Sequence, residues 1–217
     1  MMKRKLFLGF VTISALSLSG CLSLLLPEPT PANHVYRLSS DLEASATANP
    51  LATTAVTAVP SVRIDRPNAP KALQGYDLVV STEDNKLVTI ARAEWADTLP
   101  TQIQRAFISH LNMRSDLIGI LPTSGARSTY RGHITIRNFE ARFDQGQEAA
   151  PLIIVDYLVT LSNAGSRNLI GTQSFHVEQR AASIRVSDIV ASKSAANKAI
   201  LNDISDWMVQ KLSSQAG

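Results

Sequence analysis

The spacing of the apolar residues changes along this chain, and this change limits the folds that the chain can adopt. Between residues 99 and 111, apolar side chains recur at 99, 103, 106, 107 and 111, which is the spacing of one helix face. A second helical stripe, predicted to start near Ser192, consists of Ala196, Ile200, Ile204, Trp207, Met208 and Leu212. Elsewhere the apolar residues alternate, as they do in strands. The pattern predicts an α+β domain in which two amphipathic helices pack on one face of a mostly antiparallel sheet.

Alternating and β-rich runs predict where the strands lie. The expected strands cover residues 35–38, 59–65, 76–81, 86–93, 117–121, 130–143, 152–161 and 170–181. The polar stretch TEDN, residues 82–85, suits a hairpin loop. The last three strands are predicted to form an antiparallel meander. At the first helix, Asp97 or Thr98 can cap the start, and Pro100 suits the first turn.

The strand at 130–143 contains an irregularity. Ile134 and Ile136 share one parity, whereas Phe139 and Ala141 share the other. Alternate residues of a strand face opposite sides of a sheet, so a bulge near residues 137–138 would restore one continuous core face. The alternative is a strand that passes from one packing surface to another.

The N-terminal residues have the layout of a secretory signal peptide. Lys3, Arg4 and Lys5 precede an apolar run that is too short to span a bilayer. The following residues 18–21, Leu-Ser-Gly-Cys, resemble a bacterial lipobox, which implies that Cys21 is lipidated. The alternative is an ordinary signal peptide with a cysteine at the cleavage site by chance. Under the sorting rule of such lipoproteins, Leu22 implies the outer membrane, with the domain facing the periplasm.

These features divide the chain into segments. Residues 1–20 are the expected signal peptide, and residues 21–32 carry the lipid on a proline-rich tether. Residues 33–213 form the expected domain, in which 39–58 is a partly disordered loop rich in Ala, Thr and Ser. Removal of the signal leaves 217 − 20 = 197 residues and lowers the formal charge from +3 to 3 − 3 = 0. This balance disfavours a nucleic-acid partner.

No motif in the sequence indicates catalysis, a cofactor or a metal. There is neither a phosphate-binding glycine loop nor a G-x-S-x-G nucleophile turn. With a single cysteine, the chain offers no disulfide and no Cys/His metal spacing. His176 and Glu178 would share a strand face and could do acid–base work, but a surface polar pair is the preferred interpretation. Trp95 and Trp207 are interpreted as packing residues rather than ligand-stacking residues.

Several stretches together resemble a known family. They are VYRL at residues 35–38, VRIDRPNAPKALQGYDLVV at 62–80 and ARAEWADTLPTQIQRAFISHL at 91–111. These stretches resemble the auxiliary lipoproteins of ABC-type transport systems, a group that includes the lipoprotein of the Pqi operon. The resemblance implies a non-catalytic outer-membrane lipoprotein at the distal end of a lipid transport route. Its implied partner is an Mce-domain periplasmic protein of an ABC transporter.

Other functions remain open at this point. A structural or assembly lipoprotein that partners an outer-membrane β-barrel could combine the same anchor with the same fold class. A lipid hydrolase would rest on His176 and Glu178 alone. Association of the domain with copies of itself is also possible.

Two kinds of feature could bind a partner. The first is a set of arginines on one predicted strand, Arg131, Arg137 and Arg142, which could engage carboxylates or lipid phosphates. The second is a pair of polar loops, residues 144–151 and 162–168, which contribute Gln145, Gly146, Asn163 and Gly165. The alternative is that both loops are ordinary hairpin turns.

Overall fold

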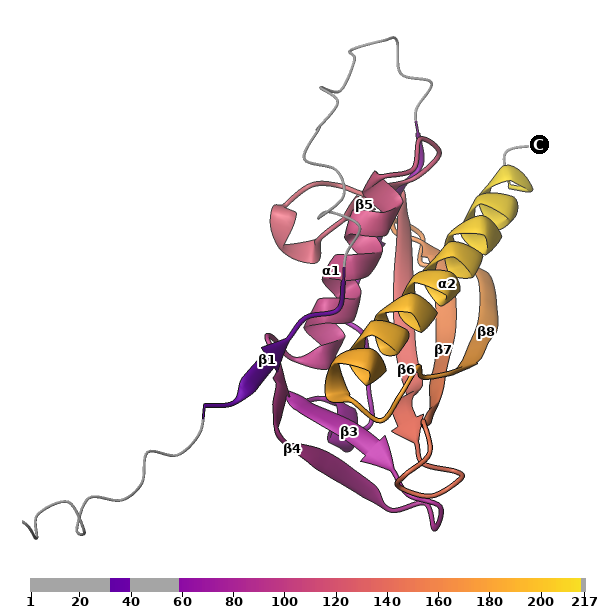
Figure 1. The fold of residues 1–217 in the computed structure, drawn as a ribbon. Coiled ribbons are helices and arrows are strands. Elements are labelled where there is room, and N and C mark those ends of the chain that lie inside the picture. Colours follow the sequence, from indigo (N-terminus) through magenta and orange to yellow (C-terminus); the bar gives the residue numbers. More distant parts are fainter. Residues whose placement is uncertain (1–31, 40–58, 216–217) are drawn as a thin grey trace, which may run out of the picture. The chain divides into compact units, whose positions relative to one another are not determined.

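One mixed sheet and two α-helices make up the part of the chain that the computed structural model describes, residues 32–39 and 59–215 (Figure 1). The helices are α1 (Leu99–Asn112) and α2 (Val186–Ser213). The strands are β1 (His34–Tyr36), β2 (Ser61–Ile64), β3 (Asp77–Ser81), β4 (Leu87–Trp95), β5 (Ile118–Ile120), β6 (Tyr130–Arg142), β7 (Leu152–Asn163) and β8 (Leu169–Arg180). The α+β class is therefore confirmed. The predictions for the signal peptide, for most of the tether and for residues 40–58 lie outside the described residues.

The prediction of a mostly antiparallel sheet is wrong. The pairs β1–β4, β2–β5, β2–β6 and β3–β6 are parallel, whereas β3–β4, β6–β7 and β7–β8 are antiparallel. Hairpin signals in the sequence report only strands that are close along the chain, and β6, β7 and β8 do form the predicted meander. The short strands β1, β2 and β5 pair with distant segments, and local spacing carries no information about that choice.

Strand β6 organises the sheet because three strands pair with it. Along one edge, β2 pairs with its first residues, 130–132, and β3 pairs with its last, 141–142. The other edge is occupied by β7 over nearly its full length. The predicted bulge is confirmed: the register shifts between Ile136 and Asn138, so Arg137 is the extra residue. Buried Ile134 and Ile136 before the shift and Phe139 after it consequently share one face of the sheet.

Both helices pack on this apolar face of the sheet (Figure 1). Helix α1 begins at Leu99 and has Pro100 in its first turn, as predicted. Helix α2 begins at Val186, and the predicted start near Ser192 is wrong. Buried Ile189 and Val190 extend its apolar stripe by more than a turn, and Asp188 in the first turn suits the positive end of the helix dipole. No helix in the described ranges is both long enough and apolar enough to span a membrane.

The core contains two polar residues from α2 that bond to the sheet. Asn197 accepts a hydrogen bond of 2.8 Å from the hydroxyl of Tyr157, and burial raises the pKa of that hydroxyl. Lys193 is only 1% exposed, and its Nζ donates to the carbonyls of Val79 and Phe139 at 3.0 and 3.2 Å. The same Nζ lies 5.2 Å from the centre of the Phe139 ring, close enough for a cation–π contact. A buried charge of this kind is stable only with such partners.

Candidate functional site

The stretch from Trp95 to Pro100 joins three segments of the chain. Trp95 ends β4, and its backbone N–H donates to the carbonyl of Tyr76 at 2.6 Å. The N–H of Ala96 donates to the carbonyl of Tyr36 at 2.7 Å, which extends the parallel pairing of β1 with β4. The first described strand is therefore held where β4 passes into α1. The side chain of Trp95 is 2% exposed, which confirms its interpretation as a packing residue.

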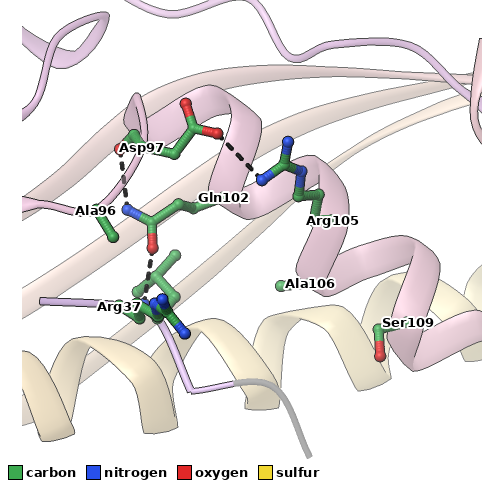
Figure 2. Close-up of a pocket in the computed structure, with 8 residues that line it drawn as sticks. Arg37, Ala96, Asp97, Gln102, Arg105, Ala106 and Ser109 are labelled. Atoms are coloured by element: carbon green, nitrogen blue, oxygen red, sulfur yellow. Dashed lines mark hydrogen bonds and ion pairs between the residues drawn. The ribbon is translucent and has the colours of Figure 1, made fainter. Parts of the chain in front are cut away.

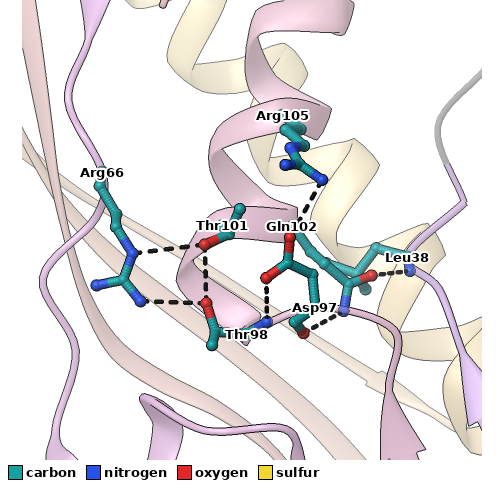
Figure 3. Close-up of polar contacts among 7 residues, drawn as sticks. All are labelled: Leu38, Arg66, Asp97, Thr98, Thr101, Gln102 and Arg105. Carbon is teal, nitrogen blue, oxygen red and sulfur yellow. Dashed lines mark hydrogen bonds and ion pairs between the residues drawn. The ribbon is translucent and has the colours of Figure 1, made fainter. Parts of the chain in front are cut away.

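The side chain of Gln102 fastens the segment after β1 to this junction (Figure 3). Its Oε1 accepts from the N–H of Leu38 at 2.9 Å, and its Nε2 donates to the carbonyl of Asp97 at 3.0 Å. One carboxylate oxygen of Asp97 accepts from the N–H of Thr98 at 2.7 Å, and the other lies 3.1 Å from Nη1 of Arg105. Asp97 therefore orders the turn before α1, whereas Thr98 occupies the N-cap position without a side-chain cap bond.

A hollow of about 440 Å³ lies between this segment and α1 (Figure 2). Its lining includes Arg37, Leu38, Asp97, Gln102, Arg105 and Ser109. The polar side chains of Asp97, Gln102 and Arg105 already bond to one another or to the backbone. The geometry supports a structural junction, and no pairing of a nucleophile with a base is present among these residues.

Replacement of Gln102 by leucine should destabilise the domain by about 1–3 kcal/mol, because it leaves the N–H of Leu38 and the carbonyl of Asp97 without their partner. Chemical denaturation of the purified protein would measure the change. Ser109→Ala, on the same helix and lining the same hollow, is the control and should have little effect. Equal stability of the Gln102→Leu variant and the parent would contradict this role.

The helix-free face of the sheet carries the arginines that the sequence singled out, but in separate places. Arg131 lies near the start of β6 and bonds to Asp65. At the bulge, Arg137 donates to Oγ of Ser174 at 3.2 Å. Arg142 ends the strand and donates to Oε1 of Glu140 at 2.6 Å. The structure therefore does not bring the three guanidinium groups together.

The two polar loops lie at opposite ends of the β6–β7–β8 meander. In the first loop, Gln145 is exposed and Gly146 has a φ of 86°, a conformation that glycine adopts without strain. Asp144 beside them accepts hydrogen bonds from Arg180, and this contact lowers the pKa of the carboxyl group. In the second loop, Oδ1 of Asn163 accepts from the backbone N–H of Gly165 and of the next residue, both at 3.0 Å.

Asn163 therefore closes its own turn, which agrees with the alternative of an ordinary hairpin turn for residues 162–168. A role of either loop in partner binding stays a prediction.

Next to this second loop lies a groove with several cationic residues, which we call the arginine groove. Its volume is about 440 Å³, and its lining includes Arg63, Arg131, Arg167, Thr160, Ser162 and Leu169. Arg131 and the neighbouring turn, residues 162–168, are among the predicted binding features, and Arg167 lies within that turn although it was not named by itself. Arg63 was not predicted. Arg63 lies beside Arg131 because β2 pairs in parallel with β6, a contact that no local pattern in the sequence predicts.

The expected polar pair on β8 is present. Nε2 of His176 lies 3.1 Å from Oε1 of Glu178, and Nδ1 lies 3.8 Å from Oδ2 of Asp156. About half of each side chain of His176 and Glu178 is exposed to solvent. Among the described residues, no three His, Cys, Asp or Glu side chains are grouped so that they could hold a metal ion.

Comparisons with known proteins identify the domain. Residues 36–205 match the model of a family described as the ABC-type transport auxiliary lipoprotein component. No curated protein matches the chain.

Two solved structures share the fold. Protein XCC0632 from Xanthomonas campestris superposes with a TM-score of 0.70 at 15% identity, over 84% of this chain and 98% of that one. Protein CT253 from Chlamydia trachomatis superposes with a TM-score of 0.50 at 10% identity, over 72% of this chain and 99% of that one. These identities are low enough that the likeness concerns the fold alone. The family match spans all but β1 and the end of α2 among the described elements, and the chain therefore belongs to the family of ABC-type transport auxiliary lipoproteins.

Proposed function

We propose that this protein is a non-catalytic component of an envelope lipid transport system, anchored in the outer membrane through Cys21. In this role the domain faces the periplasm and docks an Mce-domain protein at the distal end of the transport route. The observation that carries the proposal is the family match over residues 36–205. Exposure of each lipid methylene to water costs about 0.8 kcal/mol, so a shielded route that ends at an anchored docking domain lowers a large barrier.

The geometry of the domain supports a docking role. Strand β1 is bonded to β4, and the segment after it is bonded through Gln102 to α1, so that the first described residues are fixed to the rest of the domain. On the helix-free face, charged side chains mostly form ion pairs: Asp65 with Arg131, Glu140 with Arg142, and Asp144 with Arg180. Charged groups on a protein surface steer a partner of complementary charge and fix its orientation.

The test is recovery of the partner from cells. The full lipoprotein, carrying a C-terminal affinity tag, is crosslinked in intact cells, solubilised in mild detergent and analysed by mass spectrometry. We expect an Mce-domain protein together with an ABC permease. Another tagged outer-membrane lipoprotein provides the background. Recovery of an outer-membrane β-barrel in place of an Mce-domain protein would replace this proposal with an assembly role.

Cys21→Ser is expected to abolish lipidation and to leave the signal uncleaved or the domain soluble in the periplasm. Lipid on the cysteine anchors the chain because each buried methylene contributes about 0.8 kcal/mol and several acyl chains act together. Labelling of cells with radioactive palmitate measures lipidation, and separation of membranes on a sucrose gradient locates the parent protein. Label that persists in the variant, or a parent protein found in the inner membrane, would contradict the proposed anchor.

A further inference from the structure

The arginine groove lies on the face of the sheet that the helices leave uncovered. Gly132 faces α2, because a Cβ atom placed on it would lie 3.2 Å from Cε of Met208. Its neighbour Arg131 therefore points to the opposite side of the sheet. Ser162 and Thr160 share that side, since they are the cross-strand partners of Arg131 and His133.

Positive charge in the groove exceeds the negative charge beside it. Arg63 and Arg131 both approach one carboxylate, that of Asp65: Nε of Arg63 lies 3.6 Å from Oδ1, and Nε of Arg131 bonds to Oδ2. Nδ1 of His133 also approaches Oδ2 of Asp65, at 3.9 Å. The guanidinium of Arg167 makes no ion pair with any carboxylate in the described ranges. The single carboxylate of Asp65 therefore faces two guanidinium groups, and Arg167 adds a third positive charge to the groove.

One donor in the groove lacks an acceptor. Nε of Arg63 is buried and has no hydrogen-bond partner among the described residues, although the charge of Asp65 is close by. A buried donor without an acceptor is costly. The Arg63 side chain as a whole is 36% exposed, so other parts of it remain open to a ligand in the groove. The hydroxyls of Thr160 and Ser162 add neutral donors to the same lining.

We propose that the arginine groove binds the phosphate group of a phospholipid headgroup. Guanidinium groups from β2, β6 and the β7–β8 turn suit a tetrahedral phosphate, whose several oxygens can accept from different directions. A carboxylate of a partner protein would offer fewer acceptor oxygens than a phosphate. The carboxylate of Asp65 already pairs with Arg63 and Arg131. Leu169 also lines the groove and is 66% exposed, so an apolar side chain is available to the first methylenes of a lipid. The proposal rests on the proposed function, because lipid transport would bring such headgroups to the domain.

Binding to the full lipoprotein, purified in a neutral detergent, tests this assignment by isothermal titration calorimetry. The probes are dihexanoyl phosphatidylglycerol, its headgroup glycerophosphoglycerol, and inorganic phosphate. Arg131→Gln and Arg167→Gln should each weaken binding of the lipid at least about tenfold, the effect of one charge-assisted hydrogen bond. Arg137→Gln and Arg142→Gln make the same change of charge on β6 outside the groove and should alter binding less than about twofold.

Asp65→Asn provides a test in the opposite direction. Removal of the competing carboxylate should raise affinity for the lipid, whereas a purely structural role of Arg63 and Arg131 predicts lower stability and no gain in affinity. Arg167→Gln removes no ion pair in the described part of the chain, so its unfolding temperature should equal that of the parent.

Several outcomes would overturn the inference. One is that none of the probes binds. Another is that the groove variants and the control variants lose the same amount of affinity for the lipid. A third is that inorganic phosphate binds as tightly as the lipid. The last outcome would leave a phosphate site without a lipid. Loss of Mce-domain crosslinks in Arg131→Gln, with lipid binding unchanged, would make the groove a protein contact. Recovery of the Mce-domain partner without any phosphate binding would refute this inference and leave the proposed function intact.

Discussion

Replacement of Lys193 by methionine is expected to abolish a pH dependence of stability. In the parent protein the free energy of unfolding should rise by about 2 kcal/mol between about pH 7 and about pH 9. Burial lowers the pKa of Lys193 in the folded protein to about 7 from 10.5, against the opposing charge of Glu140. Across this range the unfolded chain keeps the proton on Lys193 and the folded protein releases it. The folded state therefore gains stability as the pH rises, and the contribution is constant below pH 7, where both states are protonated.

Urea denaturation of the parent and the variant at several pH values in this range would measure the difference. Lys198→Met removes an exposed lysine from the same helix and should keep the parental rise with pH. At pH 7 the replacement also takes away the donor to the carbonyls of Val79 and Phe139, so the slope with pH is the informative quantity. Parallel curves for the parent and Lys193→Met would show that the ammonium group is hydrated in the folded protein.

The burial of Lys193 can be predicted from its spacing along the sequence but not from its residue type. Lysine side chains are usually exposed, and the predicted apolar stripe of α2 does not contain Lys193. Its spacing from Ile189, Ala196 and Ile200 nevertheless places it on the buried face of the helix. The sequence predicts this position once spacing is weighed above residue type. The carbonyls and the aromatic ring that hold the ammonium group come from β3 and β6, and no local pattern identifies them.

Strand β6 likewise has one feature that the local sequence pattern predicts and others that depend on pairing with distant segments. Its bulge was predictable, because a change of parity around Arg137 appears directly in the order of apolar residues. Its antiparallel neighbour β7 was also predictable, as part of the meander. Its parallel neighbours β2 and β3 were not, since they lie far earlier in the chain, and β2 is too short to carry a distinctive pattern. Arg131 could therefore be proposed for binding from the sequence, whereas its placement beside Arg63 depends on a pairing between distant segments.

Trp95→Ala should lower the free energy of unfolding by about 3–5 kcal/mol, the usual cost of truncating a buried aromatic side chain. The indole is 2% exposed and meets the ring of Phe139 edge-to-face, with a centroid distance of 6.2 Å and an interplanar angle of 62°. Its loss would leave a cavity beneath the junction of β1, β4 and α1. Leu87→Ala, an apolar truncation at an exposed position of the same strand, should cost far less.

The consequence of Trp95→Ala should extend to Lys193, since Phe139 contacts both side chains. A ring of Phe139 that is free to move into the cavity would hold the ammonium group less well, so the two substitutions should not be additive. Urea denaturation of Trp95→Ala, Lys193→Met and the double variant gives the coupling energy, which we expect to be about 0.5–3 kcal/mol. A coupling near zero would show that Phe139 keeps its place without the indole, because strands β3 and β7 alone fix the backbone that carries it.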